Sequence, residues 1–159
     1  MTKLDDGING SGKGFVNVNS KDFKVLREKI QEHYNSLSNE QKRDNILFSY
    51  RMKMEKYLNN DNEEIKEVGI FIKELIKLLN IKNKDFAKYI DYEESNISAF
   101  LNGKRKVNPD LALKIAKIFN IDPILIMNIQ SKNELKNFAK INEEKYIKYN
   151  IGDLLAKVG

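Results

Sequence analysis

Residues 81–105 read IKNKDFAKYIDYEESNISAFLNGKR, and the fold of the chain can be inferred outward from them. Apolar residues recur at helical spacing in two short runs, one within residues 86–90 and the other within residues 97–101. Between the runs lies Asp91, a residue type that tolerates the left-handed backbone geometry of a turn. The stretch therefore predicts two short helices that meet at a steep angle across a turn.

The second of these helices, at about Glu94 to Leu101, has the features of a helix that reads DNA. It is too short to be stable alone, and its outward positions carry short or polar side chains that fit a major groove. Asn102 and Gly103 then end the helix, with Gly103 in the left-handed position. Basic residues follow at once, where they are well placed for phosphates.

This segment resembles the helix-turn-helix of the Xre/Cro family of bacterial and phage DNA-binding proteins, over about residues 65–130. The family pattern of an Ala in the first helix, Ile-Ser in the second and then Asn-Gly-Lys-Arg is matched by Ala87, Ile97-Ser98 and residues 102–105. Asp91 stands where the family usually has Gly. The resemblance implies an all-α fold with a five-helix core like that of lambda repressor, preceded here by a helical extension.

The resemblance also implies a set of DNA contacts. The residues expected to contact bases are Glu94, Ser95, Asn96 and Ala99. The residues expected to contact phosphates are Asn83, Lys84, Asn102, Lys104, Arg105 and Lys106. Glu94 could accept a hydrogen bond from cytosine N4. Because one helix reads only a few base pairs, we expect a homodimer on two half-sites of double-stranded DNA.

Composition narrows the function further. The 159 residues include no Cys and carry a formal net charge of +5, which excludes disulfides and thiolate metal sites and favours an anionic partner. The carboxylates are scattered beside lysines, so we expect no enzyme: no catalytic residue, no metal and no cofactor. No apolar run reaches membrane-spanning length and no signal peptide opens the chain, so we expect no membrane contact and a cytoplasmic location.

The first third of the chain is expected to be separate from the DNA-binding domain. We predict a flexible arm at residues 1–20 and a helical extension at residues 21–60, with an antiparallel pair of amphipathic helices. Ser20 is expected to cap the first of these helices, and Ser38 with Gln41 forms a capping box for the second. This region could pack on the core, or it could dock another protein. On the docking hypothesis, the partner-binding residues are Phe15, Val16, Val18, Phe23, Leu26, Ile30, Tyr50 and Met54.

The DNA-binding domain itself is predicted to occupy residues 61–138, after an Asn-rich break at residues 59–62. Asp61 and Glu64 are expected to cap its first helix, with Ile65 facing inward. Two later helices should start at Asn108-Pro109 and Asp122-Pro123, and the second of them could continue to Phe138. The tail at residues 139–159 is compatible with a helix or a strand.

The region from Ile121 to Leu135 is similar to the fifth helix of HigA-type antidotes of toxin–antitoxin pairs. Ile129-Gln130 matches the Leu-Gln pair that usually ends this segment, whereas the Trp usual near Ile126 is absent. We therefore expect a sequence-specific repressor that acts as an autoregulating antitoxin and neutralises a partner toxin. The alternatives are a phage or chromosomal Xre-type repressor with no toxin, and a structural adaptor with a vestigial helix-turn-helix.

Overall fold

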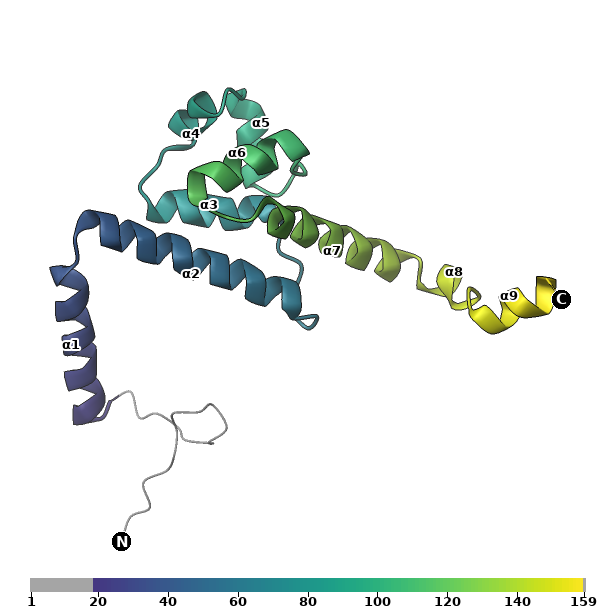
Figure 1. Ribbon diagram of the computed structural model, residues 1–159, viewed down its shortest axis with the longest axis horizontal. Helices are drawn as coiled ribbons and strands as arrows, with labels where there is room; N and C mark the ends of the chain where they lie inside the picture. The colour runs from purple at the N-terminus through teal and green to yellow at the C-terminus, as the bar shows by residue number, and fades with distance from the viewer. Residues whose placement is uncertain (1–18, 159) are drawn as a thin grey trace, which may run out of the picture. The chain divides into compact units, whose positions relative to one another are not determined.

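The computed structural model describes residues 19–158, and within that range the chain forms nine helices and no strand, which confirms the predicted all-α fold. The helices are α1 Lys21–Ser36, α2 Asn39–Asn59, α3 Val68–Leu78, α4 Asn83–Tyr89, α5 Glu94–Leu101, α6 Pro109–Phe119, α7 Pro123–Ile141, α8 Glu143–Ile147 and α9 Ile151–Val158 (Figure 1). The chain divides into two compact units, residues 1–42 and 43–159. Phe15, Val16 and Val18, predicted to bind a partner, lie outside the described residues.

In the first unit, α1 begins as the sequence predicts. The backbone N–H of Phe23 donates to Oγ of Ser20 at 3.1 Å, which satisfies one of the free amides of the first turn. The helix buries none of its residues. Four of its large apolar side chains are 43% to 60% exposed, and they are Val25, Leu26, Ile30 and Tyr34. Within the first unit, α1 therefore carries an apolar face that no other described element covers.

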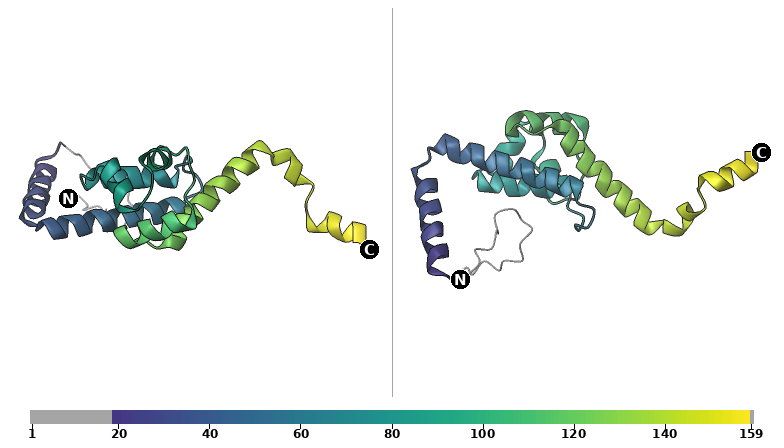
Figure 2. Two further views of the ribbon diagram at one scale, coloured as in Figure 1. Left: turned by 90° about the horizontal axis from the view of Figure 1, so that it is seen from above. Right: turned by 60° about the horizontal axis from the view of Figure 1, so that its bottom comes forward.

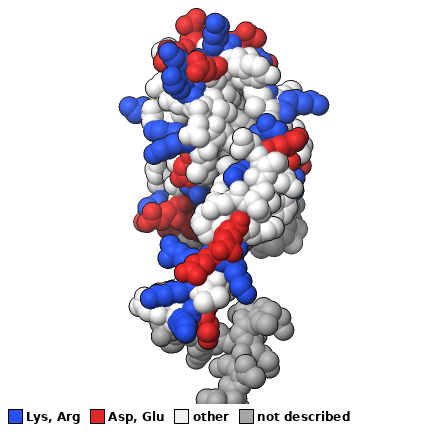
Figure 3. All heavy atoms as spheres, turned by 90° about the vertical axis from the view of Figure 1, so that its left-hand side faces the viewer, with Lys and Arg blue, Asp and Glu red and all other residues white. Residues whose placement is uncertain are grey.

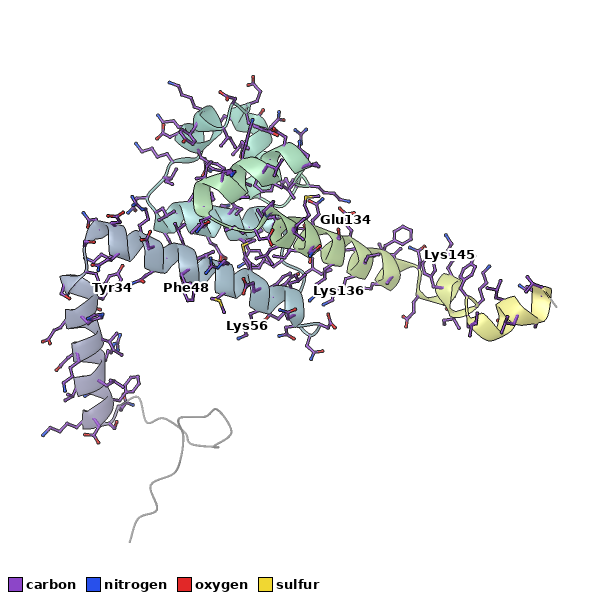
Figure 4. The ribbon with its side chains drawn as sticks, viewed as in Figure 1. Tyr34, Phe48, Lys56, Glu134, Lys136 and Lys145 are labelled. Atoms are coloured by element: carbon purple, nitrogen blue, oxygen red, sulfur yellow. The ribbon has the colours of Figure 1, made fainter. Side chains whose placement is uncertain are left out.

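The helix α2 begins at the predicted capping box, since Ser38 and Gln41 exchange two hydrogen bonds, at 2.9 and 3.1 Å. Its buried side chains are Tyr50, Met54 and Tyr57, and they belong to the same core as α3 and α7. Tyr50 and Met54 were predicted to bind a partner, and this burial removes them from any docking surface. Phe48, on the side of α2 that faces away from α3, is 56% exposed (Figure 4).

A buried polar network joins α2 to α7. The hydroxyl of Tyr57 donates to Oδ1 of Asn133 at 2.5 Å, and Nδ2 of Asn133 donates to the carbonyl of Lys66 at 2.8 Å. Nζ of Lys132 donates to three carbonyl oxygens at and just after the end of α2, each at 2.9 Å. A helix leaves its last carbonyls without internal partners, so Lys132 caps α2 from a different helix. These contacts join α2 to α7 across the Asn-rich break at residues 59–62, and both helices lie in the compact unit of residues 43–159 apart from the first turn of α2.

The helix-turn-helix is formed by α4 and α5, as residues 81–105 predict. Phe86 and Ala87 of α4 are buried, and Ile97 of α5 is completely buried. Asp91 takes the left-handed conformation expected at the turn, with φ of 57°. The helix α3 passes so close to α5 that only glycine fits at position 69. A Cβ at Gly69 would lie 1.8 Å from a backbone oxygen of α5. This close contact fixes α5 against the core.

Two further helix starts follow the prediction and one does not. Asn108 and Asp122 cap α6 and α7, each accepting a backbone N–H at 2.8 Å. The helix α3 instead starts at Val68, after Glu67 with no side-chain cap, so the predicted cap at residues 61–64 does not form. The reason is that the segment before α3 is held by the α2–α7 network and forms a connection, which leaves Ile65 38% exposed.

The C-terminal part of the second unit is helical throughout its described residues. The helix α7 continues beyond Phe138 to Ile141, and α8 and α9 follow it, so the ambiguous tail contains helices (Figure 2). Beyond Asn133 no residue of α7 is buried, and α8 and α9 bury none. No helix within residues 19–158 combines the length and the apolar character needed to cross a bilayer.

Candidate nucleic-acid interface

The helix α5 has one face in the core and one face available to a ligand. Ile97, Phe100 and Leu101 are buried, and they hold the helix on α3 and α4. On the opposite face, Glu94 and Ser95 are exposed. Asn96 and Ala99, the other two predicted base contacts, are partly exposed on the same helix. The accessible part of α5 is thus its first turn and the turn that follows, which is the part of a recognition helix that meets base edges.

A basic groove borders the first turn of α5. It has a volume of about 530 Å³ and lies between the end of α3, the start of α4 and Glu94. Four lysines and one glutamate are among the residues that line it: Lys73, Lys77, Lys82, Lys84 and Glu94. The groove brings the predicted phosphate contacts Asn83 and Lys84 beside the predicted base contact Glu94. Its excess of positive charge suits a phosphate backbone.

The loop after α5 holds the other predicted phosphate contacts. Gly103 has φ of 71°, and the N–H of Lys104 donates to the carbonyl of Ala99 at 2.9 Å, which closes the end of the helix. Farther along, the N–H of Val107 donates to Oε1 of Gln130 at 2.6 Å. Gln130, the second residue of the Ile-Gln pair, therefore anchors this basic loop to α7.

The three basic side chains of this loop have different surroundings. Among the described residues, the side chain of Lys104 forms no ion pair or hydrogen bond, so it remains available to a phosphate. Lys106 forms an exposed ion pair with Glu134 of α7 at 3.0 Å. Nη1 of Arg105 donates to Oδ1 of Asn96 at 2.6 Å. Of these three predicted phosphate contacts, Lys104 is the one whose side chain would not have to break a contact with another described residue.

Asn102 and Lys73 form a pair that sequence reasoning missed. Oδ1 of Asn102 accepts a hydrogen bond from Nζ of Lys73 at 2.6 Å, and Nδ2 donates to the carbonyl of Ser98 at 2.8 Å. The amide of Asn102 is thus engaged within the protein, and the ammonium of Lys73 places a positive charge beside it at the groove. Nothing in the sequence links these residues, since Lys73 lies in α3 and Asn102 directly after α5, 29 positions apart.

A second charged cluster lies where α2 meets α3. Glu74 accepts hydrogen bonds from Nζ of Lys66 at 2.7 Å, and from Nζ of Lys53 and the hydroxyl of Tyr50, each at 2.9 Å. Burial alone would raise the pKa of Glu74, but these three donors outweigh it and lower the pKa from 4.5 to about 2. This carboxylate therefore links α2 to the helix that supports α5.

Elsewhere the surface carries charge of both signs. Lysine and arginine side chains alternate with acidic ones around an uncharged stretch on the face that Figure 3 presents. The net charge of +5 is therefore not collected into one patch on that face. This makes the local arrangement around α5 more informative about a ligand than the net charge.

Comparison with known proteins identifies the same helix-turn-helix region in the sequence. The sequence model of the helix-turn-helix family matches residues 72–126, which run from α3 into α7. An uncharacterized HTH-type transcriptional regulator, YddM of Escherichia coli, is 29% identical over 72 residues, which cover 45% of this chain and 77% of that protein. Virulence-associated protein A′ of Dichelobacter nodosus is 34% identical over 73 residues, which cover 45% of this chain and 64% of that protein.

One solved structure is similar as well. It is an addiction module antidote protein of the HigA family from Coxiella burnetii, which superposes with a TM-score of 0.52 at 26% sequence identity. The match covers 55% of this chain and 97% of that chain. Nearly the whole of that protein is therefore matched by about half of this chain, and the rest of this chain lies outside the match.

Proposed function

Residues 72–126 form a helix-turn-helix domain of the Xre type, and on that premise we propose that the chain is a sequence-specific repressor that binds double-stranded DNA. The observation that carries the proposal is the accessible first turn of α5, with the lysine-lined groove beside that turn and Lys104 in the loop that follows the helix. Phosphate contacts near the two ends of a short helix hold it in a major groove, and base contacts from that helix supply the specificity.

The proposed repressor acts as a homodimer. One α5 spans only a few base pairs, so a specific site needs a second copy placed about 34 Å away along the duplex. The preferred DNA should therefore have two-fold symmetry, with each half-site contacted by one protomer.

A selection from random duplexes tests this proposal. Wild-type protein should enrich a two-fold-symmetric sequence. Glu94→Gln should change the preferred base at one position of each half-site, because Glu accepts from cytosine N4 whereas Gln pairs with adenine. Glu144→Gln, an exposed position on α8, should return the wild-type sequence. The base-reading role of Glu94 is wrong if Glu94→Gln returns the wild-type sequence, and the repressor proposal fails if wild type enriches nothing.

We further propose that this repressor is an autoregulating antitoxin that neutralises a partner toxin. Two observations support it: the similarity to a HigA-family antidote and the uncovered apolar face of α1, which lies outside the DNA-binding domain. An amphipathic helix with apolar anchors three or four residues apart can dock into a groove of another protein. Of the residues predicted for this role, the structure leaves Phe23, Leu26 and Ile30 accessible.

Co-expression with the product of the neighbouring reading frame tests the antitoxin role. Wild type should restore growth and capture that product. Leu26→Asp with Ile30→Asp, at positions that are 53% and 60% exposed, should abolish capture without unfolding the chain. Gln31→Asp with Asn35→Asp adds the same charge to the other face of α1 and should retain capture. A repressor without a toxin is the better account if the wild type binds its operator but captures and neutralises nothing.

A further inference from the structure

The pair formed by Arg105 and Asn96 adds a feature that general phosphate contact does not explain. Asn96 lies in the first turn of α5, and Arg105 belongs to the loop that follows the helix, nine residues later. The guanidinium donates to the carbonyl oxygen of the Asn96 side chain at 2.6 Å. A hydrogen bond from a charged donor is stronger than a neutral one, so it fixes which end of the amide faces the loop.

This bond changes what Asn96 can offer to a base. An asparagine amide has one acceptor oxygen and two N–H donors, and it recognises adenine by using both kinds of group at once. Here the oxygen lies beside a positive guanidinium, which repels the amino group that adenine or cytosine would bring to it. Among the described residues, Nδ2 of Asn96 has no hydrogen-bond partner. The two free N–H groups and the remaining guanidinium N–H groups form a cluster of donors only.

We propose that Arg105 and Asn96 act as one reading unit that prefers guanine over adenine at one base pair of each half-site. Guanine presents two acceptors, N7 and O6, in the major groove, and it is the base whose edge matches a cluster of donors. The inference rests on the proposed DNA-binding function and assigns Arg105 to base specificity, where the sequence had assigned it to a phosphate. Arg105 positions Asn96 and adds donors of its own.

The test measures base preference in the full-length protein. A wild-type selection defines the half-site, and duplexes that differ only by guanine or adenine at each position are then titrated. Arg105→Ala should lower the guanine-to-adenine affinity ratio roughly tenfold at one position of each half-site and leave the other positions unchanged. Arg105→Lys keeps the charge but lacks the planar fork, so it should not restore that ratio. Asn96→Ala should lower the ratio at the same position, and the double variant should lose no more than the larger single effect.

The outcomes separate this inference from the function on which it rests. Arg105 is a phosphate contact only, and the inference fails, if Arg105→Ala weakens all duplexes alike or if Arg105→Lys restores the wild-type ratio. The inference also fails if Asn96→Ala changes a different position or none. Lys104→Ala is the matched control for a phosphate contact, since it should weaken all duplexes equally. If wild type shows no sequence preference, the proposed function itself fails.

Discussion

At the scale of single residues, Ile97 connects the two helices of the helix-turn-helix. Its side chain is 0% exposed, and it packs in the core with Phe86. Ile97→Ala should lower the free energy of unfolding by about 2–5 kcal/mol, because it removes buried methyl groups and leaves a cavity. Ile124→Ala removes the same atoms from a position that is 61% exposed and should cost far less. Equal thermal midpoints for the two variants would show that the assignment of the buried face is wrong.

Glu74 should make part of the stability depend on pH. Its pKa is lowered to about 2 in the folded protein, below its ordinary value of 4.5. The stabilisation from Glu74 is therefore fully present above about pH 4.5 and is lost as the pH falls towards 2. Glu74→Gln should destabilise the protein at neutral pH by on the order of 1 kcal/mol. The effect is this small because the side chain is 38% exposed and solvent screens its ion pairs.

Urea denaturation between pH 7 and pH 2.5 measures this contribution. The difference in free energy of unfolding between wild type and Glu74→Gln should shrink as the pH falls below about 4.5. Glu144→Gln, at an exposed position of α8, should show little difference at any pH. A wild-type-to-Glu74→Gln difference that stays constant over the range would contradict the role assigned to the three hydrogen bonds.

The residue scale also shows what periodicity can and cannot predict about the interface. The helical spacing of the apolar residues was enough to identify the outward face of α5, where Glu94 and Ser95 are exposed. The hydrogen bonds of Lys73 to Asn102 and of Arg105 to Asn96 join separate elements, so no local pattern reveals them. Their roles follow only from the three-dimensional arrangement, while the base and phosphate contacts themselves stay predictions.

At the scale of helices, local sequence signals predicted where the helices begin more accurately than how the helices pack on one another. The caps at Ser20, Ser38, Asn108 and Asp122 are confirmed, because each depends on a side chain and an amide two or three residues away. The place of α2 was harder to predict, because it carries apolar side chains on both faces, such as Met54 in the core and Phe48 outside. The hydrogen bond that joins α2 to α7 links Tyr57 to Asn133, and these residues are 76 positions apart.

The role of α2 can be tested by shortening the chain at two points. Protein that begins at Ser38 keeps α2 and its capping box, and it should unfold at the same temperature as the full chain. Protein that begins at Asn60 loses Tyr50, Met54 and Tyr57 from the core. Loss of three large buried side chains should cost several kcal/mol, comparable to the whole stability of a small domain. Circular dichroism on heating measures both, and an unchanged midpoint for the Asn60 version would show that α2 is dispensable.

At the scale of the whole molecule, the second unit combines a DNA-binding domain with a supporting helix, and the first unit contributes an amphipathic helix with an exposed apolar face. The resemblance to the Xre/Cro family is confirmed for residues 72–126, so the fold of this part was predictable from its motif. The division of the chain was less predictable, because an Asn-rich break looks the same whether it separates domains or connects two packed helices. The homodimer and the toxin partner remain proposals.

The measurement that bears most directly on the DNA-binding proposal is the salt dependence of binding to the selected duplex. For wild type, the logarithm of the binding constant should fall linearly with the logarithm of salt concentration, since each phosphate contact releases counterions. Lys104→Ala should reduce the slope by about one and weaken binding to all sequences alike. Lys157→Ala, in α9 and outside residues 72–126, should leave the slope unchanged. Failure to bind any duplex at low salt would contradict the account and favour a structural adaptor.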